Sequence, residues 1–230
     1  GSAIVKYAYQ TGEAVDTIAT SLLVFQDAAK GFDDYEFSAD ESHLLITTET
    51  EGIYRHSFYA NYYTHNLLDN TTRPLSDFEI GKQRLASFSP NAGKVAFVRD
   101  NNIFVIDLNS EQETQVTSDG ERNKIINGAT DWVYEEEFGK DNGLFWSPDG
   151  KFLAFYRFDE TNVKEFSMPM YGQLYPEPYT FKYPKAGQEN AQVSVSVFNT
   201  ESGRTLTVLN KKTEYIPRVK WGVNNEQLIL

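Results

Sequence analysis

Residues 146–151 read WSPDGK, and the apolar LAF follows at 153–155. In this stretch an aromatic residue closes one strand, Pro-Asp-Gly supplies a tight polar turn, and apolar residues open the next strand. The stretch therefore predicts a β-hairpin.

The same pattern recurs along the chain, with its aromatic residue at positions 37, 88, 146 and 221. FSAD at 37–40 precedes LLI at 44–46, FSPN at 88–91 precedes KVAF at 94–97, and a degenerate WGVNN at 221–225 precedes LI at 228–229. One such hairpin in each four-stranded sheet, repeated about an axis, is typical of a β-propeller. The alternative is an all-β sandwich with unrelated turns, but three clear copies and one weak copy favour the propeller.

Strand periodicity supports an all-β fold. Residues 193–197 alternate as VSVSV, and 14 Tyr and 16 Phe suit half-buried pleated surfaces. We therefore predict a β-propeller of four-stranded blades, incomplete in this chain, with blade starts near 37, 88, 146 and 221. One short inserted helix and an extended arm complete the prediction.

The spacings of 58 and 75 residues between the later aromatic anchors exceed the usual propeller repeat, so these two units hold insertions. The first insertion predicts a helix at about 130–139, with Asp131 as its cap, glutamates in its first turns and Gly139 as its stop. The second, at about 163–190, is rich in Pro and Tyr and predicts an extended arm.

Composition excludes several classes of protein. A formal net charge of −12 argues against binding to nucleic acid or to an anionic membrane surface. The absence of cysteine excludes disulfides, thiolate catalysis and cysteine-based metal sites. The longest apolar run is 152–156, far short of a membrane span, and no residue pattern indicates a cofactor or a metal site.

The run NGATDWVYEEE at 127–137 resembles the double-glutamate motif of the dipeptidyl peptidase IV family, in the prolyl oligopeptidase clan. Three further segments resemble the family in the same order: YRHS at 54–57, FWSPDG at 145–150 and YPKAG at 183–187. The resemblance covers essentially the whole chain, and the lack of cysteine resembles bacterial members.

The resemblance implies a serine exopeptidase that removes N-terminal dipeptides with Pro, then Ala, in second position. Its α/β-hydrolase domain carries Ser, Asp and His, yet no Gly-x-Ser-x-Gly elbow occurs here. We therefore expect residues 1–230 to be a partial N-terminal propeller, without catalytic residues, ordered only with the rest of the enzyme. The alternatives are a non-catalytic propeller that binds peptides or proteins and a carbohydrate-binding propeller.

The family match predicts three substrate-binding residues: Arg55, Glu136 and Glu137. Adjacent carboxylates repel each other, and a substrate α-ammonium with three N–H donors would relieve that repulsion. A guanidinium presents a rigid fork of donors that could hold a substrate carbonyl. For Glu135 we expect a structural role, as partner of a nearby base or as helix cap.

The resemblance also implies a homodimer formed through the arm and a periplasmic, cell-surface or secreted location. Since the arm has little core of its own, its aromatic and apolar residues are candidate dimer anchors. These candidates are Tyr171, Leu174, Tyr175 and Phe181.

Overall fold

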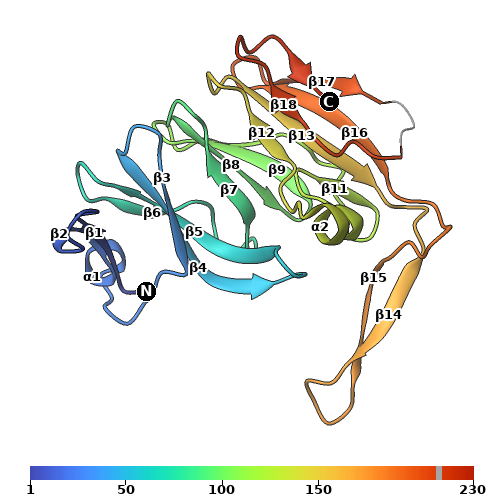
Figure 1. Cartoon of the computed structure of the whole chain (residues 1–230), viewed down its shortest axis with the longest axis horizontal. Coiled ribbons are helices and arrows are strands. Elements are labelled where there is room, and N and C mark those ends of the chain that lie inside the picture. The colour runs from blue at the N-terminus through green and yellow to red at the C-terminus, as the bar shows by residue number, and fades with distance from the viewer. Residues whose placement is uncertain (211–213) are drawn as a thin grey trace.

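The computed structural model describes residues 1–210 and 214–230. Three antiparallel sheets and the first hairpin of a fourth stand side by side like the blades of a propeller (Figure 1). The predicted all-β propeller fold, with a short helix and a projecting arm, is confirmed. Blade I contains β3 (Asp34–Phe37), β4 (His43–Gly52), β5 (Phe58–Asn66) and β6 (Thr72–Pro74).

Blades II to IV follow in chain order. Blade II contains β7 (Arg84–Phe88), β8 (Lys94–Arg99), β9 (Asn102–Asp107) and β10 (Glu113–Gln115). Blade III contains β11 (Ile125–Asn127), β12 (Leu144–Trp146), β13 (Phe152–Asp159), β16 (Gln192–Asn199) and β17 (Arg204–Leu209). The described part of blade IV is the hairpin of β18 (Lys220–Trp221) and β19 (Leu228–Ile229).

The recurring turn has a recurring hydrogen-bond pattern. In the first three units a buried serine follows the aromatic residue and donates its hydroxyl to the Asp or Asn two positions later, at 2.6 to 2.7 Å. The same hydroxyl accepts the backbone N–H of the residue that begins the next strand, at 2.9 to 3.0 Å. The serines are Ser38, Ser89 and Ser147. The recurring aromatic-Ser-x-Asp/Asn pattern therefore corresponds to one turn geometry in these three units.

Turns of adjacent blades also bond to one another. Asn91 Nδ2 of blade II donates to the carbonyl of Asp149 in blade III at 3.2 Å. The backbone N–H of Asp149 in turn donates to Asn225 Oδ1 of blade IV at 3.2 Å. The repeated polar positions therefore stabilise the turn and also connect blade II to blade III and blade III to blade IV.

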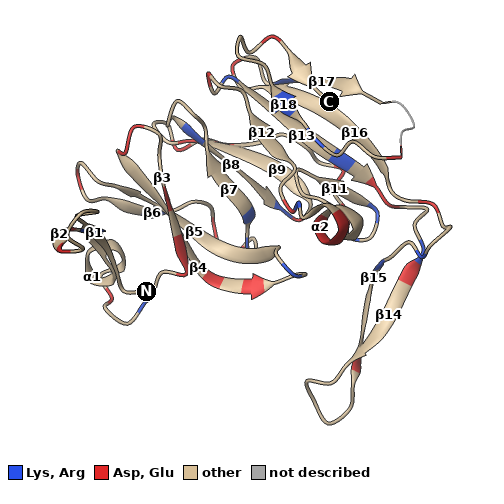
Figure 2. Ribbon diagram, in the orientation of Figure 1, with Lys and Arg blue, Asp and Glu red and all other residues tan. Residues whose placement is uncertain are grey.

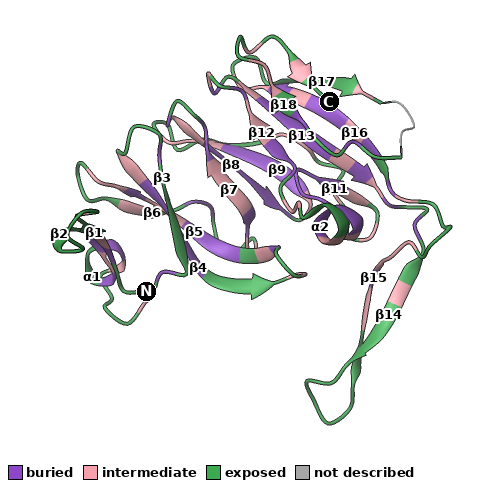
Figure 3. Ribbon diagram, in the orientation of Figure 1, coloured by how far each residue is buried: buried purple, intermediate pink, exposed green. Residues whose placement is uncertain are grey.

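The hydrophobic core lies between blades, and the buried residues concentrate on the central strands of the blades (Figure 3). In β8, Val95 and Phe97 pack toward blade I, whereas Ala96 and Val98 pack toward blade III. In β13, Leu153 and Phe155 face blade II. The alternating residues Ala154, Tyr156 and Phe158 face blade IV. This two-sided burial explains why the central strands read as unbroken apolar runs.

An N-terminal unit that the sequence analysis did not predict covers the outer face of blade I. It comprises the hairpin of β1 (Ala3–Tyr7) and β2 (Ala14–Thr20) and the short helix α1 (Ser21–Phe25). Ile4, Ala19 and Val24 pack there against Leu44 and Ile46 of β4. The unit covers this face of blade I in the way that blades I and III cover the two faces of blade II.

The arm is an antiparallel hairpin of β14 (Glu165–Met170) and β15 (Glu177–Lys182), which projects away from the blades (Figure 1). Its tip is exposed, but Phe181 near its base is only 6% exposed. The ring of Phe181 lies 5.5 to 6.1 Å from four other rings, those of Tyr54, Phe166, Tyr179 and Tyr183. The prediction that Phe181 anchors a dimer is therefore wrong, because its ring packs within this chain.

In the described part of the chain, no helix is long and apolar enough to cross a membrane.

We predict that Tyr156→Phe destabilises the intact protein by about 1 to 3 kcal/mol, since it leaves a buried carbonyl without its donor. The fully buried Tyr156 hydroxyl donates to the carbonyl of Ile216 at 2.7 Å. Chemical denaturation gives the change in the free energy of unfolding. The control is Tyr9→Phe, because Tyr9 is fully exposed, and equal effects from the two variants would contradict the prediction.

Candidate functional site

Helix α2 (Trp132–Phe138) interrupts the inner edge of blade III. The strands on either side of it, β11 and β12, both pair with β13, so the helix leaves the sheet between them. Asp131 caps the helix by accepting the N–H of Tyr134 at 3.0 Å, and Gly139 ends it at a φ of 62°. Asp131 and Gly139 therefore hold the cap and stop positions expected from the sequence.

Aromatic contacts hold α2 against the blades. The ring of Tyr134 lies 4.8 Å from that of Phe158, and its hydroxyl accepts the N–H of Ile216 at 2.7 Å. The ring of Trp132 lies 4.4 Å from that of Tyr183 at the base of the arm. These contacts fix the direction in which the three glutamates of the helix point.

The three glutamates have different environments. Glu135 is fully buried, and its Oε1 accepts the backbone N–H groups of His56 at 2.7 Å and Ser57 at 2.8 Å. Glu136 is partly buried, with Oε2 at 3.2 Å from Arg55 Nε. Glu137 is exposed. Glu135 thus has a structural role, as expected: it accepts the backbone amides of a neighbouring loop, while Asp131 caps the helix.

Arg55 lies in the loop between β4 and β5. Strand β4 ends at Gly52, and residues 53–57 connect it to β5 and carry the arginine. Its side chain is 72% exposed, and its ion pair with Glu136 joins segments 81 positions apart in the sequence. Figure 2 shows the acidic ribbon of α2 from which Glu136 extends.

The site therefore presents a guanidinium on one side and two neighbouring carboxylates on the other. Two carboxylates can accept the N–H groups of a compact ammonium, and a guanidinium can donate to a carbonyl oxygen. Arg55 lies on a loop of blade I, and the two glutamates lie on the helix inserted in blade III. This arrangement suits the free N-terminus of a peptide.

Comparison with known proteins identifies the family. The family described as "Dipeptidyl peptidase IV (DPP IV) N-terminal region" matches residues 38–230. The chain belongs to the dipeptidyl peptidase IV family.

Relatives within the family include fungal and bacterial proteins. The chain is 37% identical over 185 residues to a probable dipeptidyl-aminopeptidase B of Talaromyces marneffei, covering 74% of this chain and 20% of the relative. It is 34% identical over 195 residues to dipeptidyl peptidase 4 of Trichophyton rubrum, covering 82% and 25%. It also resembles the crystal structure of Porphyromonas gingivalis dipeptidyl peptidase 4, with a TM-score of 0.91, 46% identity and coverage of 99% of this chain and 33% of that one. The chain thus spans about a fifth to a quarter of the length of the two curated fungal relatives.

The three histidines of this family member make different hydrogen bonds. His65 Nδ1 is 2.8 Å from the hydroxyl of Thr72, and His43 Nδ1 is 2.8 Å from that of Ser42. His56 contributes its backbone N–H to Glu135. Residues 1–210 and 214–230 contain no group of three or more side chains able to hold a metal ion.

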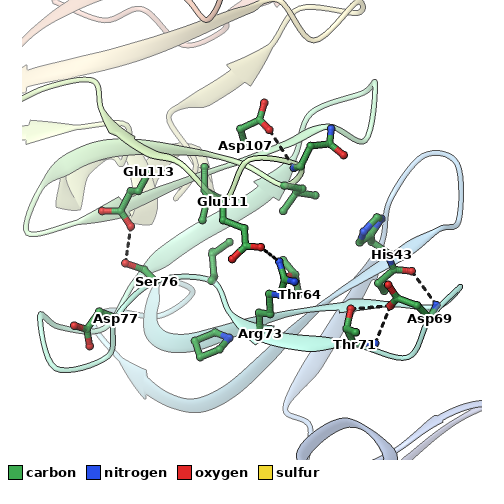
Figure 4. A pocket seen from close by; sticks show the side chains of 16 residues that line it. His43, Thr64, Asp69, Thr71, Arg73, Ser76, Asp77, Asp107, Glu111 and Glu113 are labelled. Atoms are coloured by element: carbon green, nitrogen blue, oxygen red, sulfur yellow. Dashed lines mark hydrogen bonds and ion pairs between the residues drawn. The ribbon is translucent and has the colours of Figure 1, made fainter.

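A pocket of about 720 Å³ lies at the outer edges of blades I and II (Figure 4). Its polar groups bond largely to one another: Ser76 donates to Glu113 at 2.6 Å, Thr71 donates to Asp69 at 2.7 Å, and Arg73 pairs with Glu111. Arg55, Glu136 and Glu137 are absent from its lining. Because none of these three residues lines the pocket, we do not place the candidate site there.

A second pocket, of about 490 Å³, lies at the base of the arm beside the candidate site. Arg84, Tyr54, Phe181 and Glu160 line it, and Arg84 and Glu160 are 5% and 6% exposed. No sequence motif indicated either of these charged residues. Burial raises the pKa of Glu160 to about 7, the negative charge of Asp131 adds to this rise, and Lys182 opposes it.

We predict that Glu160→Gln stabilises the protein at pH 8 by on the order of 1 to 3 kcal/mol. The pKa of Glu160 is higher in the folded chain than its ordinary value of 4.5, so the folded state binds more protons between about pH 4.5 and 7. Its contribution to stability therefore falls as pH rises through this range, and Gln removes the loss.

Chemical denaturation at pH 4.5 and pH 8 measures this effect, with Glu177→Gln on the exposed face of the arm as control. A wild-type protein that is more stable than Glu160→Gln at pH 8 would contradict the prediction.

Proposed function

We propose that this chain binds and orients the N-terminus of a peptide within a serine exopeptidase that releases Xaa-Pro and Xaa-Ala dipeptides. The observation that carries the proposal is the ion pair between Arg55 Nε and Glu136 Oε2, at 3.2 Å. The exposed Glu137 follows Glu136 on the same helix. The family relationship supports the dipeptidyl peptidase activity and a periplasmic, cell-surface or secreted location.

In this proposal, Glu136 and Glu137 accept hydrogen bonds from the substrate α-ammonium, and Arg55 donates to a carbonyl of the first residues. A fixed ammonium position sets the distance from the N-terminus to the scissile bond, so cleavage occurs after two residues. A longer N-terminal extension would displace the ammonium from the carboxylates. The nucleophile comes from the α/β-hydrolase domain that the family resemblance implies outside these 230 residues.

Neutralising either glutamate tests the ammonium anchor. In the intact enzyme, we expect Glu136→Gln and Glu137→Gln each to lower kcat/KM for a Gly-Pro reporter by about tenfold or more, since a charge-assisted bond contributes about 1.5 to 3 kcal/mol. The matched control is Glu79→Gln, which makes the same charge change at an exposed position outside the site. An N-acetylated substrate has no ammonium, and full activity on it would remove the basis of the proposal.

We also propose that the arm forms a homodimer contact. Tyr171, Leu174 and Tyr175 at its tip are 79%, 91% and 80% exposed, which is unusual for three large apolar side chains within five residues. The buried Phe181 supports the base of the arm from within the chain. A rigid hairpin that carries apolar side chains at its end suits insertion against a second copy.

Replacing Tyr171, Leu174 and Tyr175 together by Ser should convert the dimer of the intact enzyme to a monomer, because the contact loses its apolar anchors. Sedimentation velocity at micromolar concentration measures the change. Tyr9→Ser is the control, since Tyr9 is equally exposed but lies on the N-terminal hairpin. A wild-type enzyme that sediments as a monomer would rule out this contact.

A further inference from the structure

Three buried side chains at the inner side of the candidate site have polar atoms without a hydrogen-bond partner in the described part of the chain. These atoms are Ser57 Oγ, Glu135 Oε2, and Nε and Nη2 of Arg84. Ser57 lies against Glu135, since its N–H donates to Oε1 of that carboxylate at 2.8 Å. Arg84 interacts electrostatically with the same carboxylate.

A glutamate carboxylate buried without a nearby cation is strongly destabilising. Glu135 is fully buried, and its two backbone donors satisfy only Oε1. Arg55 pairs with Glu136 instead. The charge of Glu135 therefore needs another group, one that carries a positive charge.

Arg84 has the chemistry and the position to supply that charge. It begins β7 in blade II, between the blades that carry Arg55 and Glu135, and it is 5% exposed. Burial lowers its pKa, and the neighbouring Tyr59, Glu135 and Asp141 oppose that decrease. An arginine keeps its charge even when it is buried, so it stays a cation beside Glu135.

The comparison with Arg99 shows why Arg84 differs from an ordinary buried arginine. Arg99 is also 5% exposed, but it bonds to Ser76 and, at 2.7 Å, to Glu113 within its own blade. Arg84 has no such partner in its own blade. The acidic residues that interact with it electrostatically, Glu135 and Asp141, belong to the segment that builds the candidate site.

We propose that Arg84 is a positioning residue of the substrate site: as the counter-ion of Glu135, it fixes the loop that carries Arg55. This inference rests on the proposed function of Arg55. Arg84 stabilises the Glu135 carboxylate by charge, without a direct hydrogen bond between the two side chains. Glu135 holds the N–H groups of His56 and Ser57, and these two residues follow Arg55 in the loop. Because the Arg55 side chain is 72% exposed and has one ion pair, its position depends on this backbone.

The test uses steady-state kinetics of the intact enzyme on a Gly-Pro reporter. We expect Arg84→Gln to lower kcat/KM by about tenfold, mainly through a higher KM, because a loosened Arg55 loses binding that ground state and transition state share. Arg84→Lys keeps the charge without the planar fork and should give a smaller loss. Arg99→Gln is the matched control and should lower the denaturation midpoint while leaving KM unchanged.

Double variants separate positioning from a general loss of stability. If Arg84 acts through Glu135 and Arg55, Arg84→Gln should have little further effect on KM in an Arg55→Gln or Glu135→Gln background. The same fold-change in KM in the single and double variants would overturn the proposal, and so would an unchanged KM in Arg84→Gln. If Arg84→Gln does not fold, the same comparison with Arg84→Lys decides between these outcomes.

The kinetics of the Arg84 variants can be distinguished from the test of the proposed function. An unchanged KM in Arg84→Gln, together with a large loss in Glu136→Gln, would reject the positioning role and leave the ammonium anchor intact. Full activity of Glu136→Gln and of an N-acetylated substrate would reject the proposed function itself.

Discussion

The hydrogen bonds from His56 and Ser57 to the buried Glu135 carboxylate are the interaction on which the candidate site depends. They connect a loop of blade I to a helix of blade III, across the inner side of blade II. A carboxylate accepting two backbone N–H groups makes charge-assisted bonds, and full burial protects these bonds from competition by water. The ion pair between Arg55 and Glu136 forms at the surface only because this buried connection brings its two segments together.

The propeller supplies the frame for that connection. Since each blade packs apolar side chains on both faces, neither blade I nor blade III can move without disturbing the core that each shares with blade II. The hydrogen bonds between adjacent turns restrain the opposite ends of blades II to IV. The loop and the helix therefore extend from supports whose relative positions are fixed by packing.

The sequence predicted the features that depend on local chemistry. Asp131 and Gly139 cap and stop the helix, and the Phe88 and Trp146 turns mark successive blades, because each requires particular residues at fixed short spacing. The burial of Phe181 and the charge of Arg84 beside Glu135 depend on residues far apart in the chain, which no local pattern records. One usable signal was the helical period, which places Glu135 one turn after the capping Asp131 and hence on the inner side.

Three consecutive glutamates acquire three different environments because successive helical residues are rotated by about 100° from one another. Glu135 points into the protein, Glu136 lies at the boundary, and Glu137 is exposed. A buried carboxylate is favourable only when its charge and hydrogen bonds are satisfied, so Glu135 is suited to holding a neighbouring segment. Glu136 and Glu137 retain access to solvent and can exchange water for a ligand. The same residue type thus serves as a structural support at one position and as a candidate ligand group at the next two, and the direction of each side chain decides which.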